Sequence, residues 1–535
     1  MKKTYLRTQT AKFAKGQIDR RQFITSVVAA GVALPSALTM ASDVLAATPK
    51  SGGHFRQGFG HGSTTDSLDP GSHENGFTQN MVFSYTNNLT EVDNHGKLVA
   101  ELAEEIGASD DAKTWTFKLR KGIEFHNGKT MTADDVITSF NHHRGDDSKS
   151  AAKGLLAAVT DIRKDGDNSV VFELDSGNAD FPFIASDYHL GIMPAKDGKI
   201  DFLSGVGTGG YKLEKFEPGV RVTFTRNPNY FKEGRAHFDS VETLSLLDTT
   251  ARQNAVMNGD VEMVDKVDPK TVHLLARVPT LTILETTGTQ HYTFPMRVTA
   301  KPFDNYDLRM AIKLAINRQE LVDKILLGHG SVGNDHPISI ANQYHAADLA
   351  QREYDPDKAR AHLKKAGMEG ATVELSTSDA AFPGAVDAAL LVKASAKSIG
   401  LNVEVVREPK DGYWSNVWNK KPWCACYWGG RATEDWMFSS AYTKDTEWND
   451  TDWRTGEAAD RFNALVLEAR SELNPDKRRT LYAECQALIR DDGGAVVPMW
   501  ANHIHGVSKK LAHDEAVAGN WQNDGNKNVE RWWFA

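Results

Sequence analysis

The body of the chain alternates short strand-like and helix-like segments, and this alternation most constrains what it can fold into. Residues 115–120 alternate apolar and polar side chains, which predicts a half-buried strand. Thr132 and Asp135 then form a capping box that begins a helix through Phe140. Further strands are expected at 169–174, 211–216, 220–225, 372–376 and 402–406, and further helices at 249–258, 307–317, 356–366 and 385–399. The pattern predicts a mixed α/β protein.

Length and charge bound the class of protein. With 535 residues, of which 40% are hydrophobic and 25% charged, the chain predicts a globular protein of two or three domains. The formal charge of −9 and the lack of a long basic run in the body argue against nucleic acid as a partner. An acidic binding protein or enzyme remains.

The first 46 residues have the character of a twin-arginine signal peptide. The residues RRQFI at 20–24 are typical of that export route, and a mildly apolar run follows at 23–42. We expect cleavage after Ala46 or Ala47 rather than retention as a membrane anchor, because Thr, Ser, Gly and Pro interrupt the run. The segment holds seven basic and two acidic residues, so the exported remainder would carry a net charge of −14. No cysteine stands at the cleavage site for lipid attachment, which predicts a freely diffusing periplasmic protein.

Cysteine and histidine patterns give no sign of a metal or another cofactor. The three cysteines, Cys424, Cys426 and Cys485, are too few for a disulfide framework, although one bridge to Cys485 stays open. A Cys-x-Cys metal site is disfavoured because no histidine or further cysteine lies at ligand spacing. The histidine pairs at 142–143 and 503–505 also lack such partners, so solvated or capping roles are expected for them.

A glycine motif at 205–210 matches the G-x-G-x-x-G pattern of dinucleotide-binding turns. That motif must precede a helix, whereas residues 211–216 alternate as a strand and turn at 218–219. Dinucleotide binding is therefore disfavoured. The common nucleophile-elbow, zinc-peptidase and P-loop signatures are absent as well, which leaves only triads assembled from distant residues for catalysis.

Six segments of the chain resemble, in order, the solute-binding proteins of peptide, nickel and opine ABC importers, known as extracellular solute-binding family 5. The segments are SLDP at 67–70, TWTFKLRKGIEFHNGKTMTADDVITSF at 114–140, GVGTGGYKL at 205–213, NPNYF at 227–231, NAVMNGDVEMVD at 254–265 and KPFDNYDLRMAIKLAINRQELV at 301–322. The resemblance spans nearly all of the chain after the signal segment. It identifies the glycine motif as the crossover turn of that family.

The resemblance implies an α/β periplasmic binding protein of type 2, with three lobes in two halves that close on a ligand cleft. The first lobe would comprise residues 47–84, 206–295 and 505–535, the second 85–205 and the third 296–504. It also implies capture rather than catalysis. The expected partners are a small solute and an ABC permease in the inner membrane, and the protein itself is expected to be a monomer.

An aromatic stretch from Tyr413 to Trp453 holds 11 aromatic residues among 41, and seven of them are tryptophans. Aromatic faces supply apolar contact area and attract cations. Half or more of these rings are expected to fill the core of the third lobe. The others mark a ligand-binding wall, whose paired glycines would let a ligand approach backbone amides. The wall residues are Trp428, Gly429, Gly430, Arg431, Glu434, Asp435 and Trp436.

This wall departs from the pattern of the peptide-binding members that it resembles. In those members a tryptophan is followed three positions later by an aspartate that pairs with the α-ammonium group of the peptide, whereas Trp428 is followed by Arg431. A guanidinium favours a carboxylate, phosphate or sulfonate, and Glu434 and Asp435 would take over the binding of a cation. Where dipeptide binders place a carboxylate-binding arginine, this chain has Asp387. The structural alternative is an ion pair between Arg431 and Asp435 without ligand contact.

We therefore expect the periplasmic substrate-binding component of an ABC importer, which captures a small peptide or peptide-like polar solute. A non-peptide anionic or opine-like solute is the alternative within the family and fits the exchanged charges better. Nickel is disfavoured because no histidine cluster marks the cleft. A secreted hydrolase that uses Glu434 and Asp435 is disfavoured too, since adjacent carboxylates diverge, whereas paired glycosidase carboxylates face each other about 5–9.5 Å apart.

Overall fold

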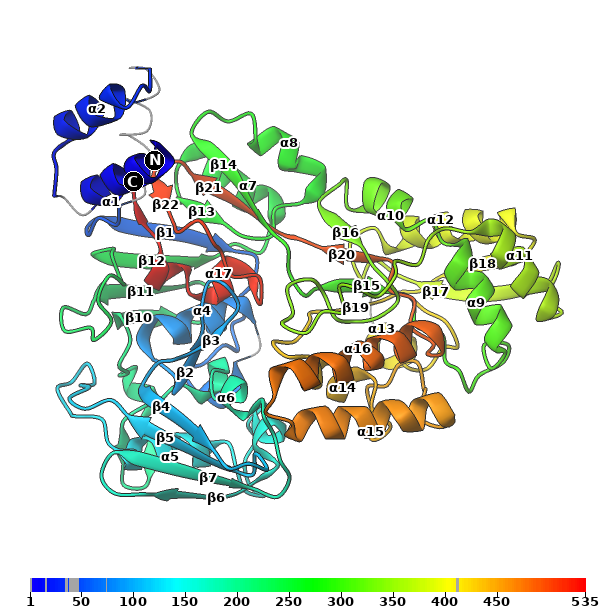
Figure 1. Cartoon of the computed structure of the whole chain (residues 1–535), viewed down its shortest axis with the longest axis horizontal. Coiled ribbons are helices and arrows are strands. Elements are labelled where there is room, and N and C mark those ends of the chain that lie inside the picture. Colours follow the sequence, from blue (N-terminus) through cyan, green and yellow to red (C-terminus); the bar gives the residue numbers. More distant parts are fainter. Residues whose placement is uncertain (1, 15–16, 34–36, 38–47, 74, 410–412) are drawn as a thin grey trace.

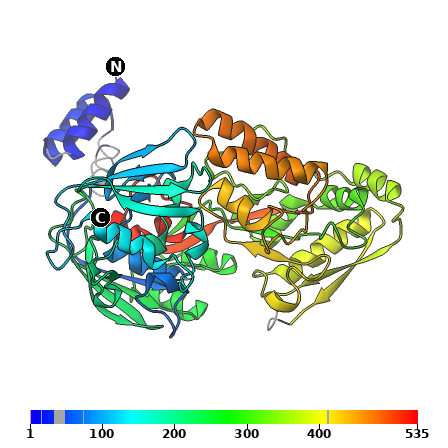
Figure 2. The same ribbon diagram turned by 90° about the horizontal axis from the view of Figure 1, so that it is seen from below.

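The computed structural model describes residues 2–14, 17–33, 37, 48–73, 75–409 and 413–535. The expected cleavage site at Ala46 or Ala47 lies outside the described residues. The chain forms three regions, each around its own sheet. Two of them lie side by side at one end of the molecule, and the third lies across from both (Figures 1 and 2).

The first region is built around a seven-stranded sheet in the order β10-β11-β12-β1-β13-β21-β14. Its strands are β1 (His54–Phe59), β10 (Tyr211–Glu217), β11 (Arg221–Arg226), β12 (Ser240–Ser245), β13 (Met263–Val264), β14 (Leu281–Thr286) and β21 (His503–Ser508). Around it lie α4 (Gly76–Tyr85), α7 (Thr249–Asn258), α8 (Val272–Leu275), α17 (Gln522–Asn526), α18 (Asn528–Arg531), the short helices 70–72 and 269–271, and the strand pair β22 (Leu511–Ala512) and β23 (Trp533–Phe534). It has two cores, one rich in phenylalanine and the other made of valine, leucine and isoleucine.

The second region holds a four-stranded antiparallel sheet in the order β4-β5-β7-β6. Its elements are β2 (Thr90–Val92), β3 (Leu98–Ala100), β4 (Ala103–Ala108), β5 (Thr114–Leu119), α5 (Ala133–His142), β6 (Val159–Lys164), β7 (Ser169–Leu174), α6 (Phe181–Ile184), β8 (Ala195–Lys196), β9 (Lys199–Ile200) and the short helices 153–156, 188–190 and 202–204. In β5 every second side chain is buried, as its alternation predicts. The predicted helix start is confirmed, because Thr132 N donates to Asp135 Oδ2 over 2.9 Å.

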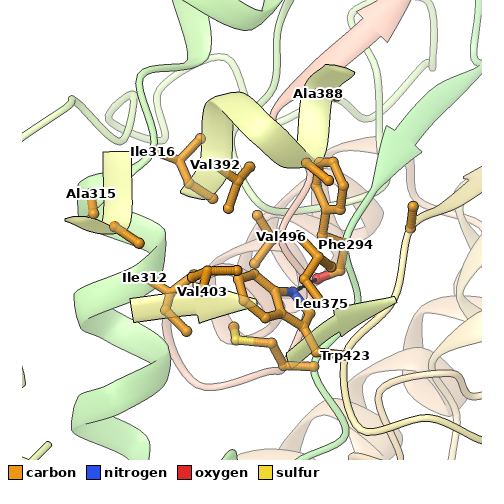
Figure 3. Packing of buried hydrophobic residues seen from close by; sticks show 14 of the residues in the cluster. Phe294, Ile312, Ala315, Ile316, Leu375, Ala388, Val392, Val403, Trp423 and Val496 are labelled. Carbon is orange, nitrogen blue, oxygen red and sulfur yellow. Dashed lines mark hydrogen bonds between the residues drawn. The ribbon is translucent and has the colours of Figure 1, made fainter. Parts of the chain in front are cut away.

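The third region combines a four-stranded sheet, in the order β16-β20-β15-β19, with the parallel pair β17 and β18. Its strands are β15 (His291–Thr293), β16 (Gly330–Val332), β17 (Thr372–Thr377), β18 (Asn402–Arg407), β19 (Cys426–Trp428) and β20 (Met499–Ala501). Its helices are α9 (Tyr306–Ala315), α10 (Arg318–Ile325), α11 (Pro356–Lys365), α12 (Ala385–Ser398), α13 (Tyr413–Asn416), α14 (Glu434–Ala441), α15 (Glu457–Ser471) and α16 (Pro475–Asp491). Figure 3 shows its core, where the indole of Trp423 donates to the carbonyl of Phe294 over 3.1 Å.

The predicted helices and strands are confirmed with small shifts at their ends. The helix expected at 307–317 ends at Ala315, because Asn317 accepts from Glu320 N over 3.1 Å and thereby caps α10. The glycine motif leads into β10 rather than into a helix, as expected. A side-chain carbon at Gly207 would stand 2.0 Å from the carbonyl oxygen of Tyr85, so the motif serves close packing of the chain against α4.

The origin of the strands, the state of the cysteines and the N-terminal helices bear on the remaining expectations. The seven-stranded sheet draws its strands from three separated stretches, as the expected division into lobes requires, and the lobe boundaries themselves stay a prediction. All three cysteines are buried and free. The helices α1 (Lys2–Ala14) and α2 (Arg20–Ala29) pack on each other apart from the body (Figure 2). Within the described part of the chain, no helix combines the length and the apolar character needed to cross a membrane.

Candidate ligand-binding cleft

A cleft of about 1420 Å³ separates the third region from the other two and is lined by residues of all three. Two chain segments cross beside it, since residues 287–290 connect β14 to β15 and Asn502 connects β20 to β21. Ala501 N donates to Gln290 O over 3.0 Å, and Asn502 Nδ2 donates to Glu285 Oε1 over 2.6 Å. The two crossings therefore lie side by side, which is the geometry of a hinge between two bodies.

Aromatic side chains of the third region form one wall of the cleft. Six of the 11 rings between Tyr413 and Trp453 are buried in cores, which confirms the expected half or more. Trp428 is one of these six and also lines the cleft, together with the five remaining rings. The indoles of Trp418 and Trp428 both donate to Asp450 Oδ2, over 3.1 and 3.2 Å. Burial raises the pKa of Asp450 to about 6. The lining rings are Trp414, Trp418, Tyr427, Trp428, Trp436 and Trp448.

Arg431 lies on this wall between two indole rings. Its guanidinium carbon is 5.7 Å from the ring centre of Trp428 and 5.8 Å from that of Trp436, within range of cation–π attraction. The one described hydrogen bond of its side chain runs from Nη1 to the carbonyl of Gly430, over 2.7 Å. Burial lowers the pKa of Arg431, and the nearby Tyr188 and Asp187 oppose that change. No carboxylate among the described residues forms an ion pair with it.

The paired glycines of the wall have different roles. A side-chain carbon at Gly429 would meet no atom within 4 Å, so the backbone there is open to the cleft. Gly430 has a φ of 74°, and a side-chain carbon would stand 2.0 Å from Thr289 Oγ1 in the crossing segment. Gly430 is therefore required for packing of the wall against the hinge, whereas the backbone at Gly429 is open to the cleft.

Glu434 and Asp435 belong to the first turn of α14 and point away from the main cleft. Glu434 accepts from Tyr344 N over 2.6 Å and lines a second cavity of about 250 Å³, which Arg431 also lines. Asp435 pairs with Arg470 at 3.0 Å rather than with Arg431. Burial raises the pKa of Glu434 to about 7 and that of Asp435 to about 6. The two carboxylates thus serve different partners inside the third region.

Asp387 lies in the first turn of α12 with an exposed side chain and does not line the cleft. Of the wall expected from the sequence, Trp428, Gly429, Gly430, Arg431 and Trp436 line the cleft together.

The opposite walls come from segments that the sequence reasoning did not connect. The second region contributes Tyr188, whose ring lies 5.6 Å from that of Trp521, and both rings line the cleft. His189 also lines it and pairs through Nδ1 with Asp187 Oδ1 at 2.6 Å. The first region contributes His61 and Lys266.

The second and third regions also touch each other directly. Asp180, just before α6, pairs with Arg478 of α16 at 2.7 Å, and both side chains are more than 90% buried. Ala179 N donates to Arg470 O over 2.6 Å beside this pair. The two halves are therefore joined at this contact as well as through the hinge.

Of the solvated or capping roles expected for the histidine pairs, the structure shows no fully solvated ring, since all four are half-buried or buried. His503 and His505 line the cleft, and burial lowers their pKa values to about 3 and about 4. His505 Nε2 accepts from Asn523 N over 3.1 Å, which is a capping role. In the other pair, His142 contacts Asp69 at 2.8 Å and His143 contacts Ser150 at 2.6 Å.

One acidic cluster among the described residues has spacing suited to a metal ion, with ligand atoms within 4.8 Å of one another. Cations already occupy this cluster. Lys527 contacts Glu101 at 3.0 Å and Arg531 contacts Glu91 at 2.8 Å. Lys232 reaches Glu530 at 3.1 Å, so the charges are balanced without a metal. The acidic residues are Glu91, Glu101 and Glu530.

Comparison with known proteins decides the family. Residues 97–450 match the family model described as bacterial extracellular solute-binding proteins, family 5 Middle. The chain belongs to this family. One curated relative of this family 5 protein is di/tripeptide-binding protein 1 of Pseudomonas aeruginosa, which is 25% identical over 81% of this chain and 86% of the relative. Another is the dipeptide-binding protein of Escherichia coli, which is 23% identical over 78% of this chain and 83% of the relative. These relatives are binding proteins rather than enzymes.

Solved structures share the fold of this family 5 protein, which is that of type 2 periplasmic binding proteins. DppA from Helicobacter pylori, in complex with the peptide STSA, superposes with a TM-score of 0.72 at 20% identity and covers 91% of this chain and 98% of its own. AgaA from Agrobacterium tumefaciens R10, in complex with agropinic acid, superposes with a TM-score of 0.71 at 21% identity. This match covers 90% of this chain and 99% of AgaA. The family accounts for the cleft between two hinged halves.

Proposed function

We propose that this family 5 protein is the periplasmic substrate-binding component of an ABC importer and captures a small peptide or peptide-like polar solute. The observation that carries the proposal is the Arg431 guanidinium, which lines an aromatic cleft beside a hinge and has no ion-pair partner among the described residues. An acidic group of the solute would supply that partner. The names of the curated relatives support the peptide-like class.

Binding and closure follow from the geometry. The indoles of the third region offer flat apolar surfaces, and the backbone at Gly429 offers hydrogen bonds to a solute. A solute that contacts both halves favours the closed arrangement, because it binds that arrangement more tightly than the open one. The closed protein would then deliver the solute to its membrane permease. We also propose that residues 1–46 direct export by the twin-arginine route and that the protein acts in the periplasm as a monomer.

A non-peptide anionic or opine-like solute is the second candidate. Its support is that Glu434 and Asp435, the carboxylates nearest Arg431 in sequence, engage Tyr344 and Arg470 instead of facing the main cleft. A peptide α-ammonium group would thus find no free carboxylate from this stretch. The same engagement argues against turnover by these two side chains, so we propose capture without catalysis.

A thermal-shift screen of the purified protein tests this proposal. Dipeptides, tripeptides, opines and amino-acid conjugates are compared for wild type, Arg431→Met and the matched control Arg479→Met, whose arginine is exposed on α16. A solute at 100 times its Kd stabilises by about 2.7 kcal/mol. Shifts with peptides that Arg431→Met removes support the first candidate. Shifts confined to non-peptide anions support the second, and turnover of a bound solute or the absence of any shift contradicts the proposal.

A further inference from the structure

We propose that Lys266 and His61, on the side of the cleft formed by the first region, make a second anion-binding subsite for an acidic group of the solute, a carboxylate in a peptide-like ligand. This inference rests on the proposed function, because it assigns a further contact to the same solute. With Arg431 on the facing wall, it predicts a solute with two acidic groups.

Lys266 is held at the cleft by its backbone. It follows β13 in a left-handed conformation, with a φ of 47° that side-chain-bearing residues rarely adopt. Arg252 fixes this turn by donating to the carbonyls of Lys266 over 3.0 Å, of Asp265 over 3.1 Å and of Leu246 over 2.7 Å. The guanidinium of Arg252 is thus used by the backbone, while the ammonium of Lys266 faces the cleft.

His61 presents a hydrogen-bond donor to the same place. Its Nδ1 accepts from the backbone N–H of Gly76 over 3.2 Å, and a backbone N–H can only donate. The ring proton therefore lies on Nε2, the atom that contacts Lys266 Nζ. Two donors face each other with no acceptor between them. An oxyanion that accepts from both would resolve this mismatch.

The surrounding charges leave the subsite positive. Gly76 is the first residue of α4, so the positive end of that helix lies beside His61. Asp265 is fully buried and accepts from Gly60 N over 2.7 Å, and Asp268 accepts from Lys270 N over 2.9 Å. Neither carboxylate forms an ion pair with Lys266 in the described chain.

The histidines nearby add no further charge, so the positive charge comes from Lys266 and Arg252. Burial, with Lys266 and Arg252 as smaller causes, lowers the pKa of His61 to about 3, so its ring is neutral. His503 and His505 of β21 are neutral for the same reason of burial. Burial also lowers the pKa of Lys266, although its side chain stays open to water in the cleft. An acidic group of the solute would hold the proton on this ammonium.

The test measures, by calorimetry at fixed ionic strength, how much a second carboxylate improves binding. The peptide probes are Gly-Glu and Gly-Gln, which have the same shape but differ by one acidic group. Glutarate and butyrate form a matched non-peptide pair, and inorganic phosphate is a third probe. The variants are Lys266→Met and His61→Leu, with Lys270→Met as a control at an exposed lysine of the same segment.

We expect wild type and Lys270→Met to bind Gly-Glu on the order of tenfold to a hundredfold more tightly than Gly-Gln. Lys266→Met should reduce this ratio to below about threefold and leave Gly-Gln nearly unchanged, and His61→Leu should reduce it by a smaller factor. Circular dichroism and the melting midpoint without ligand report whether each variant is folded.

The outcomes separate the two proposals. If peptides bind and the ratio survives in both Lys266→Met and His61→Leu, the subsite is overturned and the proposed function stands. A second outcome is that peptides do not bind, whereas the protein binds phosphate or prefers glutarate to butyrate. If Lys266→Met abolishes that binding or preference, the subsite stands and the peptide-like class of solute is overturned. If wild type binds none of the probes, both are overturned.

Discussion

Two arginines of the third region, the half-buried Arg431 and the buried Arg478, lie beside aromatic rings but differ in their charged neighbours. The guanidinium carbon of Arg431 lies 5.7 and 5.8 Å from two indole centres, and that of Arg478 lies 5.0 and 5.3 Å from two tyrosine centres. Arg478 has a carboxylate partner, Asp180, at 2.7 Å. Arg431 has none among the described residues, and it lines the main cleft.

The electrostatics of the two sites differ accordingly. Burial acts to lower the pKa of Arg478, but Asp180, Tyr482 and Tyr344 together outweigh burial and the pKa is raised. At Arg431 burial prevails and the pKa is lowered. A buried charge without a partner is costly, and proteins retain it where a ligand supplies the partner. The comparison therefore places Arg478 in the contact between the halves and supports the proposal that Arg431 binds the solute.

Loss of the Asp180 carboxylate should have the largest effect on stability. Asp180→Ala leaves the Arg478 guanidinium buried and unpaired, which should lower the free energy of unfolding by about 3 kcal/mol. Urea denaturation measures this change. Arg479→Met, which removes an exposed neighbour of Arg478, should cost less than about 1 kcal/mol. Equal losses of stability in Asp180→Ala and Arg479→Met would show that Arg478 does not depend on its carboxylate partner, and would contradict the contrast between Arg478 and Arg431.

Arg431→Met should show the reverse behaviour. Because no described carboxylate pairs with Arg431, the variant should change the free energy of unfolding without ligand by less than about 1 kcal/mol. Its affinity for an acidic solute should fall on the order of tenfold or more, since a charge-assisted contact is lost. Denaturation and calorimetry on the same preparation measure both quantities. A large loss of stability would make Arg431 a structural residue like Arg478.

Glu434 predicts a dependence of stability on pH. Its pKa is raised from 4.5 to about 7, so the folded state holds a proton that the unfolded state releases. Stability should therefore fall as pH rises from about 4.5 to 7, by about 2 kcal/mol in this contribution. In Glu434→Gln, whose amide oxygen can still accept from Tyr344 N, that decline should be smaller. Melting midpoints of wild type and Glu434→Gln at pH 5 and pH 8 measure this decline. An equal decline in both proteins would contradict the prediction.

The smallest effect is expected at Asp387. Its side chain is exposed on α12 and lies outside the cleft lining, so Asp387→Asn should change solute affinity less than about twofold. Calorimetry with the solute found for wild type measures this. A tenfold change would place a ligand contact on α12 and weaken the assignment of the charged site to Arg431.

The sequence predicts elements whose signals are local. The strand at Ser169–Leu174 and the helix at Thr249–Asn258 have the predicted ends, because alternation and capping act over a few residues. One wall of the cleft was predictable for the same reason, since Trp428, Arg431 and Trp436 belong to one continuous stretch.

The rest of the site depends on information that a linear reading does not hold. Glu434 and Asp435 turn into the protein because Thr433 caps α14, and the Thr433 hydroxyl accepts from Trp436 N over 3.3 Å. His61 and Lys266 are 205 residues apart, and their contact arises only when β1 and β13 pair in the seven-stranded sheet.

The most direct test of the account compares a dipeptide that has a free C-terminal carboxylate with its C-terminal amide, by calorimetry on wild type and Arg431→Met. The account predicts that wild type prefers the free acid on the order of tenfold or more and that Arg431→Met loses this preference. An unchanged preference in Arg431→Met would contradict the central claim that the unpaired guanidinium of the cleft binds the acidic group of the solute.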